Sequence, residues 1–175
     1  MRSDNLHYGI IGNGASGALV SKDASVDWLC LPHFASPSVF AKILDKKGGH
    51  LGLTSVANAV THQSYLENTN ILKTVFESED GSFEVLDFMP RYQKVNGRYY
   101  NPPELTRIIK PLTGRSAIAI DYQPALEYAK GTTETHIKGS HLISISEDET
   151  HYDTLFFYSN IPYTKVLEGG SFVLT

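Results

Sequence analysis

The carboxylates are the residues of this chain best suited to hydrolytic chemistry. Cleavage of a glycosidic bond needs only two carboxyl groups placed on either side of that bond, and the chain has 19 Asp and Glu residues. The pattern does not select a pair, since several lie in apparent turns such as 147–149, where solvated charge is the ordinary interpretation. Asp27 and Asp87 lie beside predicted strands, where a structural hydrogen bond is equally plausible. We therefore predict no catalytic residue in this chain.

A glycine-rich segment, residues 12–17, has the literal G-x-G-x-x-G spacing of dinucleotide-binding folds. That chemistry needs a helix directly after the glycines, whose amides hold the pyrophosphate, and an acidic residue about 20 positions further on. Only three apolar residues follow before the turn-like segment 21–25, and the region of the acidic residue, 33–35, is His-Phe-Ala. We predict a turn between strands and no cofactor.

Histidine and cysteine offer no metal site. His136 and His141 flank a predicted hairpin turn and could face each other across it, but zinc normally takes three or four protein ligands. Cys30 is the single cysteine, so it forms no intramolecular disulfide, and its apolar surroundings predict an inert thiol. These features predict no bound metal and fit a reducing compartment.

Composition and charge narrow the class of protein. The chain has 175 residues, 41% of them hydrophobic, with 8 Phe, 10 Tyr and 1 Trp, which is enough to bury a core. Its 15 basic and 19 acidic residues give a net charge of −4, and no basic run exceeds Lys46-Lys47, so neither nucleic acid nor an anionic membrane is an expected partner. No stretch approaches the roughly 18 apolar residues of a membrane span or resembles a signal peptide. We expect a cytoplasmic protein.

The dominant hydrophobic period is two, which is typical of strands with one buried face. Segments 71–77 and 83–88 are predicted to pair as a hairpin, because Asp80-Gly81 between them suits a tight turn. Segments 105–112 and 115–122 are predicted to form a second hairpin in the same way. Further strands are expected at 133–137, 142–146, 152–158 and 171–175.

One segment has a helical signature. Ser36 is a residue type that caps helices, Pro37 suits the first helical position, and apolar residues then recur on one face up to Gly48. We therefore expect one short helix near 37–45. A dozen or more short strands with so little helix predict an all-β fold, an antiparallel β-sandwich forming a single domain over residues 1–175.

Several segments closely resemble the N-terminal part of bacterial and archaeal glycoside hydrolase family 15, which includes glucoamylase, glucodextranase and trehalase-like enzymes. They are Ile11-Gly12-Asn13-Gly14, 18–20, 26–32, 34–41, 44–45, 65–72, Val85-Leu86-Asp87-Phe88-Met89-Pro90 and Arg107-Ile108-Ile109. The sequence departs from the family pattern at His33 and Ala35, where Arg and Asp are expected.

The resemblance implies a non-catalytic domain. In this family the region is a β-sandwich, sometimes called a super-sandwich, that precedes a helical (α/α)6 barrel carrying both catalytic glutamates. Residues 1–175 lack the helical periodicity of a barrel, so we expect them to be the N-terminal part of a larger enzyme that hydrolyses α-glucosidic bonds with inversion. Trehalose, dextrins and other glucosides all remain open as substrates of that parent.

Two sets of residues are candidates for contacts. Trp28, His33 and Phe34 are candidates for the contact with the barrel and the entrance to its active site, as part of an apolar segment 26–44 that would cause weak self-association when uncovered. The alternative function is a carbohydrate-binding module that binds α-glucosides, for which Tyr92, Tyr99 and Tyr100 could form a stacking platform.

Overall fold

The computed structural model describes residues 7–55, 57–147 and 152–174. The strands of this part are β1 (Tyr8–Gly12), β2 (Gly17–Ser21), β3 (Val26–Cys30), β4 (Ser38–Phe40), β5 (His50–Ser55), β6 (Val60–Tyr65), β7 (Leu72–Ser78), β8 (Gly81–Phe88), β9 (Tyr92–Gln93), β10 (Tyr99–Tyr100), β11 (Thr106–Gly114), β12 (Ala117–Gln123), β13 (Thr133–Lys138), β14 (His141–Glu147), β15 (Tyr152–Phe157) and β16 (Phe172–Val173). The short helical segments are α1 (Leu126–Ala129) and α2 (Tyr163–Leu167). The all-β expectation is confirmed.

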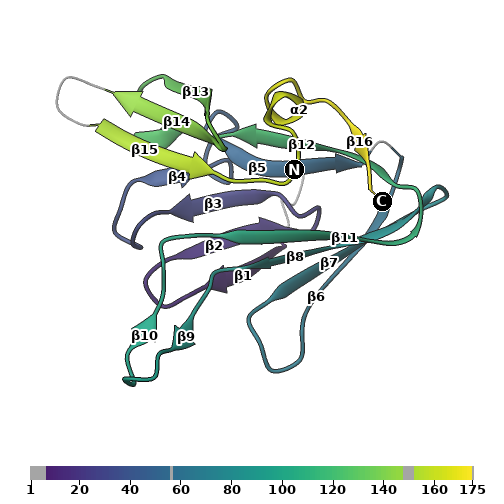
Figure 1. The fold of residues 1–175 in the computed structure, drawn as a ribbon, viewed down its shortest axis with the longest axis horizontal. Helices are drawn as coiled ribbons and strands as arrows, with labels where there is room; N and C mark the ends of the chain where they lie inside the picture. Colours follow the sequence, from purple (N-terminus) through teal and green to yellow (C-terminus); the bar gives the residue numbers. More distant parts are fainter. Residues whose placement is uncertain (1–6, 56, 148–151, 175) are drawn as a thin grey trace, which may run out of the picture.

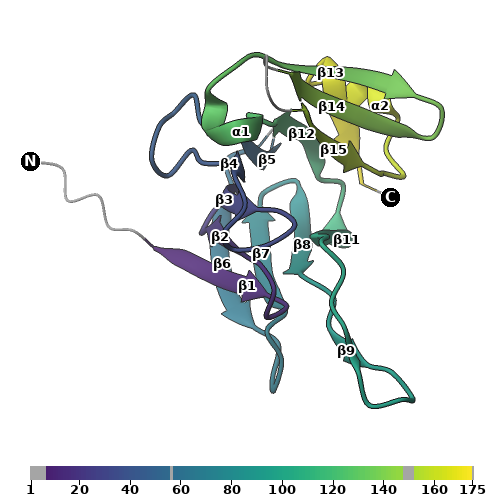
Figure 2. The same cartoon turned by 90° about the vertical axis from the view of Figure 1, so that its left-hand side faces the viewer.

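The strands form three antiparallel sheets and one small hairpin (Figures 1 and 2). The first sheet has the order β1-β2-β3-β5-β12-β16, with β4 beside β3. The second sheet has the order β11-β8-β7-β6, and the third has the order β13-β14-β15. The remaining pair, β9 and β10, projects away from the sheets, and we call residues 91–101 the arm.

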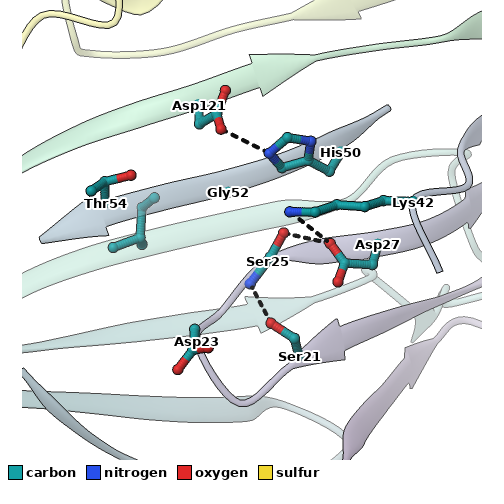
Figure 3. Close-up of a pocket in the computed structure, with 10 residues that line it drawn as sticks. Ser21, Asp23, Ser25, Asp27, Lys42, His50, Gly52, Thr54 and Asp121 are labelled. Carbon is teal, nitrogen blue, oxygen red and sulfur yellow. Dashed lines mark hydrogen bonds and ion pairs between the residues drawn. The ribbon is translucent and has the colours of Figure 1, made fainter. Parts of the chain in front are cut away.

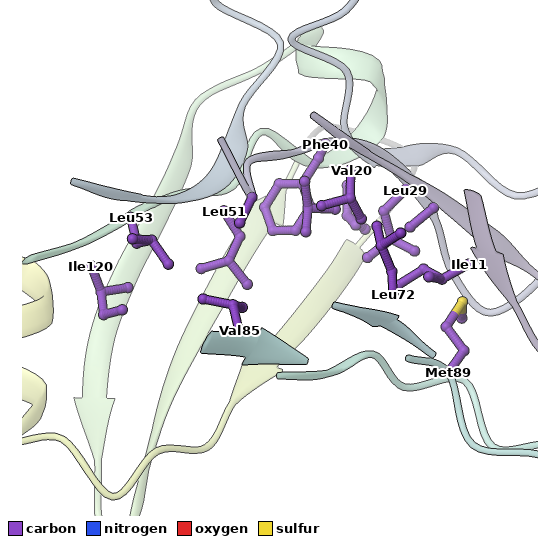
Figure 4. Close-up of a cluster of buried hydrophobic side chains, with 14 of the residues drawn as sticks. Ile11, Val20, Leu29, Phe40, Leu51, Leu53, Leu72, Val85, Met89 and Ile120 are labelled. Carbon is purple, nitrogen blue, oxygen red and sulfur yellow. The ribbon is translucent and has the colours of Figure 1, made fainter. Parts of the chain in front are cut away.

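The core lies between the first and second sheets (Figure 4). Strand alternation turns Ile11, Val20 and Leu51 inward from the first sheet, where they meet Leu72 and Val85 of the second. The outer face of the first sheet, meaning the face turned away from the second sheet, therefore carries the alternate residues of the same strands.

The third sheet extends this core through aromatic contacts. The Tyr122 ring lies 4.6 Å from that of Phe157 and 6.4 Å from that of Phe40, measured between ring centroids. The Tyr122 hydroxyl shares a 2.9 Å hydrogen bond with Ser144 Oγ of β14. Burial raises the pKa of Tyr122 to about 12, so this hydroxyl keeps its proton and its hydrogen bond throughout the ordinary pH range.

A buried ion pair links the two main sheets. Arg107 of β11 donates to both carboxylate oxygens of Asp87 on β8, at 2.7 Å and 3.0 Å. The same guanidinium donates to the carbonyl oxygen of Ala24 at 2.6 Å and, over 3.4 Å, to that of Leu51 in β5. Asp87 is fully buried, so both of its oxygens depend on these donors.

The outer edge of β1 is capped by side chains from the opposite sheet. The Tyr65 hydroxyl accepts a hydrogen bond from Ile10 N at 2.8 Å and donates one to Ile10 O at 2.9 Å. Asn70 Nδ2 donates to the carbonyl oxygen of Gly12. An unpaired strand edge is a template for association with another chain, so Tyr65 at the end of β6 and Asn70 in the β6–β7 connection protect it.

The helix expected near 37–45 is wrong. Residues 38–40 form β4, which pairs with β3, and all three are buried. Ala41 N then donates to Gly48 O at 2.7 Å, and a side chain at Gly48 would clash with Ala41 O. Of the apolar positions that suggested one helical face, Val39 and Phe40 belong to this buried strand and Ile43 and Leu44 lie in the turn after it, because tertiary pairing outweighs local propensity.

The hairpin expected between 105–112 and 115–122 is also wrong. β11 pairs with β8 and β12 pairs with β5, so the turn at Gly114, where φ is +65°, carries the chain from the second sheet to the first. The β7–β8 hairpin through Asp80-Gly81 is confirmed. The strands expected at 133–137, 142–146, 152–158 and 171–175 correspond to β13, β14, β15 and the shorter β16.

We predict that Arg107→Met lowers the free energy of unfolding by about 3–5 kcal/mol, because it leaves the Asp87 charge buried without a partner. The measurement is urea unfolding of the chain. Lys110→Met is the matched control on the same strand: its Nζ lies 3.7 Å from Glu84 in a solvent-exposed pair, whose loss should cost less than about 1 kcal/mol. Equal effects of the two changes would contradict this assignment.

We also predict that Tyr65→Phe lowers the free energy of unfolding by about 1 kcal/mol and increases aggregation, because it removes both hydrogen bonds to the β1 edge. Tyr158→Phe is the control, since that side chain is 68% exposed. Light scattering during thermal unfolding measures the aggregation. A Tyr65→Phe protein that scatters no more than the control would show that the edge needs no cap.

Candidate functional site

Asn13 joins the β1–β2 turn to the base of the arm. Its side chain is 1% exposed, and its Nδ2 donates to the carbonyl oxygen of Pro102 at 2.8 Å. Its Oδ1 accepts from the backbone N–H groups of Ala15 at 3.0 Å and Ser16 at 3.1 Å. Gly14 completes the turn with φ of +87°. The glycine-rich segment is therefore a turn between strands, as predicted, and it also anchors a neighbouring loop.

The loop that carries His33 and Phe34 lies against the same turn. Phe34 N donates to Ala15 O at 3.0 Å, and His33 N donates to Ser36 Oγ at 3.1 Å. A Cβ atom at Gly17 would stand 3.1 Å from the Phe34 ring, so the absence of a side chain there lets the ring lie over β2. Both His33 and Phe34 are exposed, with Phe34 at 64%.

Trp28 belongs to an apolar row on the outer face of the first sheet. It pairs across the strands with Leu19, which in turn pairs with Ile10. Ile11, Ala18, Val20 and Leu29, which adjoin these three residues along the strands, are buried in the core, so the three point outward. Ile10 is 63% exposed, whereas Leu19 and Trp28 are half-buried. A Cβ atom at Gly17 would point to this same face, toward the Phe34 ring. We therefore define the outer-face patch as Ile10, Leu19, Trp28 and Phe34.

The segment 26–44 contributes to both the core and the surface. Val26, Leu29, Val39 and Phe40 are buried in the core. Phe34 and Leu44 are exposed, by 64% and 75%. Only part of the apolar segment is thus available for contact with another domain.

The three candidate tyrosines lie together on the arm. Tyr92 and Tyr100 are cross-strand partners whose ring centroids are 5.0 Å apart. The guanidinium of Arg91 lies 4.4 Å above the Tyr99 ring, and Lys94 Nζ lies 4.6 Å above that of Tyr100. The tyrosines are exposed, as a stacking platform requires, but cations already cover one face of two rings.

Sequence reasoning missed a polar cleft of about 310 Å³ on the outer face of the first sheet (Figure 3). Its centre is Gly52, which pairs across the strands with Asp121. His50 Nε2 lies 2.8 Å from Asp121 Oδ2, and Asp27 lies on the other side of the cleft. No motif spacing could reveal this cleft, because its residues come from β2, β3, β5 and β12, from the β2–β3 turn and from the loop after β4.

The carboxylates of the cleft are engaged in structural contacts. Asp27 accepts hydrogen bonds from Tyr8 at 2.9 Å and Ser25 at 2.5 Å, and lies 3.8 Å from Lys42 Nζ. Burial, followed by the hydrogen bond to Asp27 and the charge of that carboxylate, raises the pKa of Tyr8 to about 12. The oxygens of Asp27 are therefore taken up by these donors, as in a structural carboxylate.

The histidines of the β13–β14 hairpin do not face each other. His136 pairs across the strands with Ile143, and its Nε2 lies 3.2 Å from Glu134. His141 pairs with Lys138. In the described ranges, no three His, Cys, Asp or Glu side chains are grouped so that they could hold a metal ion. Burial raises the pKa of the Cys30 thiol, as expected of an unreactive cysteine.

Comparison with known families identifies this architecture. A family model described as trehalase-like, N-terminal, matches residues 6–150, which include the outer-face patch, the arm and the polar cleft. The chain belongs to this family. The resemblance expected from residues 11–14, 26–32 and 85–90 is therefore confirmed.

The relatives of this trehalase-like N-terminal domain are much longer proteins. Trehalase of Thermoplasma volcanium is 34% identical over 130 residues, which are 71% of this chain and 20% of the relative. Trehalase 1 of Sulfolobus acidocaldarius is 44% identical over 87 residues, 49% of this chain and 15% of the relative. Trehalase of Mycobacterium tuberculosis is 28% identical over 134 residues, 69% and 20% of the two chains. The matched region is at most about a fifth of these relatives, and no solved structure matches significantly.

The described part of this trehalase-like N-terminal domain contains no helix that is both long and apolar enough to cross a membrane.

We predict that Asn13→Ala lowers the free energy of unfolding by about 1–3 kcal/mol, because the buried Pro102 carbonyl and two N–H groups of the turn lose their partner. Amide hydrogen exchange should speed up at Ala15 and Ser16, which donate directly to Asn13. Asn58→Ala is the control, since that residue is exposed. Unchanged exchange at both amides would show that Asn13 does not order the turn.

Proposed function

We propose that this chain is the non-catalytic N-terminal domain of a glycosidase that hydrolyses α-glucosidic bonds with inversion, with trehalose as the first substrate to test. The supporting observation is the match to the trehalase-like N-terminal family over residues 6–150, in relatives of which the chain spans about a fifth or less. The catalytic groups then belong to the rest of the parent chain. The buried, reduced Cys30 supports a cytoplasmic location.

In this proposal the domain packs against the catalytic domain through the outer-face patch. Phe34 and Ile10 expose more than half of their surface, although hydrogen bonds hold their backbone, from Phe34 N to Ala15 O and from Ile10 N to the Tyr65 hydroxyl. A rigid apolar surface loses little conformational entropy when it is covered, which favours a permanent contact. Without the catalytic domain, the same patch would support weak self-association of the chain.

The alternative function, a carbohydrate-binding module, has less support. A pyranose ring stacks on an open aromatic face, whereas Arg91 and Lys94 cover one face each of Tyr99 and Tyr100, and Tyr92 is tilted against Tyr100. Arginine and tyrosine together are more typical of protein interfaces.

The test of the catalytic assignment compares the full-length parent with the 175-residue chain. The parent should release one β-glucose and one α-glucose from each trehalose, because inversion changes the configuration at the carbon attacked by water and the leaving glucose keeps its α configuration, as NMR can follow. The 175-residue chain should release none. Hydrolysis by the short chain that is abolished by changing one of its own carboxylates would overturn the proposal.

We predict that Ile10→Ser lowers the melting temperature of the full-length parent but leaves that of the 175-residue chain unchanged within about 1 °C, because the side chain is covered only in the parent. Val60→Ser is a matched control, since both side chains are 63% exposed in this chain. Differential scanning calorimetry of the four proteins measures the effect. If Ile10→Ser and Val60→Ser shift the parent equally, the outer-face patch is not the contact.

A further inference from the structure

The arm concentrates positive charge and aromatic surface. It contains Arg91, Lys94 and Arg98, and no acidic residue lies between Asp87 and Glu104. The whole chain has a net charge of −4, so the arm has the opposite sign to the domain that carries it. All of its residues are exposed, and Val95 at its tip is fully exposed. An exposed valine beside exposed tyrosines and arginines is typical of a protein–protein interface.

The arm is ordered by its own hydrogen bonds. Lys94 N donates to Arg98 O at 2.8 Å, and Gly97 N donates to Lys94 O at 2.9 Å. The side chains of Gln93 and Asn96 add hydrogen bonds to the backbone of Gly97 and Arg98, at 3.1 Å each. The two cation–π pairs hold Arg91 and Lys94 against the tyrosine rings. These contacts pre-organise a projecting element that buries almost nothing in this chain.

The arm begins where the outer-face patch ends. Its base is fixed by the hydrogen bond from Asn13 to Pro102, and Arg91 Nη1 would lie 3.5 Å from a Cβ at Gly14. The next residue of the same turn, Ala15, accepts the hydrogen bond from Phe34 N. From this base the arm extends beyond both main sheets (Figure 2). A domain that covers Phe34 is therefore the one that the arm would reach.

We propose that the arm reaches the carboxylate-lined substrate cleft of the parent's catalytic domain and forms part of the wall that selects short α-glucosides. The proposal rests on the proposed function. Inverting hydrolysis of a glycoside requires two carboxyl groups in that cleft, and the one that acts as general base carries a negative charge. Lys94 and Arg98 complement this charge, and Val95 and the tyrosines supply the apolar contact area.

A wall of this kind affects how tightly a substrate binds and which lengths of substrate fit the cleft. It narrows the cleft beyond the first sugar units, so a disaccharide fits and a longer chain meets the arm. It does not touch the bond that breaks, so its loss should raise KM far more than it lowers kcat. This division of effects separates a wall from a merely stabilising element, which would change the amount of folded enzyme and leave KM alone.

The first experiment measures trehalose hydrolysis by the full-length parent carrying both Lys94→Glu and Arg98→Glu. We expect KM to rise about fivefold or more while kcat stays within about threefold, since charge reversal repels the arm from the carboxylates. Lys138→Glu, an exposed lysine at the end of β13, is the control and should leave both constants unchanged. Wild-type KM in the double variant would overturn the proposal.

The second experiment replaces residues 93–98 of the parent with Gly-Gly, which shortens the arm without touching its base. We expect a higher KM for trehalose and a higher rate on maltotriose relative to trehalose. Unchanged KM and an unchanged ratio would overturn the proposal.

These outcomes are separable from failure of the proposed function. If Ile10→Ser destabilises the parent while both arm variants behave as wild type, the docking assignment stands and only the arm proposal falls.

Discussion

The buried pair of Arg107 and Asp87 is the interaction on which the rest of this structure depends. A carboxylate with no solvent exposure is costly unless donors satisfy it, and Arg107 supplies two of them from the neighbouring strand. The remaining donors of the same guanidinium reach carbonyl oxygens of Ala24 and Leu51, which belong to the opposite side of the sandwich. The planar guanidinium of Arg107 therefore sets the orientation of the two main sheets relative to each other. That orientation decides which side chains point outward.

Strand alternation then divides adjacent residues between the core and the outer face. Ile11 is fully buried, whereas Ile10 beside it is mostly exposed and joins Leu19 and Trp28 in the outer row. At the end of this row, Asn13 satisfies the backbone of three positions and fastens two loops to each other. The result is a rigid surface with exposed apolar groups, which costs stability in water and is retained where another domain covers it.

This arrangement suits a domain that supports chemistry performed elsewhere. The polar groups of the cleft form two pairs: Lys42 lies 3.8 Å from Asp27 of β3, and His50 of β5 is hydrogen-bonded to Asp121 of β12. Their oxygens are thus occupied by structural donors, in contrast to a catalytic pair, whose carboxyl groups must face a substrate across open space. The exposed apolar and aromatic groups lie instead on the outer-face patch and the arm, which we propose as surfaces for contact.

The sequence by itself determined the all-β class, the β7–β8 hairpin, the turn at residues 12–17 and the family, because each rests on local signals: hydrophobic period, turn residues and short motifs. The sequence also predicted that Tyr92, Tyr99 and Tyr100 lie on one loop, since they are close in sequence. It placed a helix at 37–45 and joined β11 to β12, and both were wrong because strand pairing between distant residues decides those segments. The inter-sheet role of Arg107, the polar cleft and the meeting of Phe34 with Gly17 were decided only by the tertiary structure. The physical reason is that hydrogen bonds and packing between residues far apart in the chain leave no periodic trace in the sequence, whereas alternation and turn chemistry do.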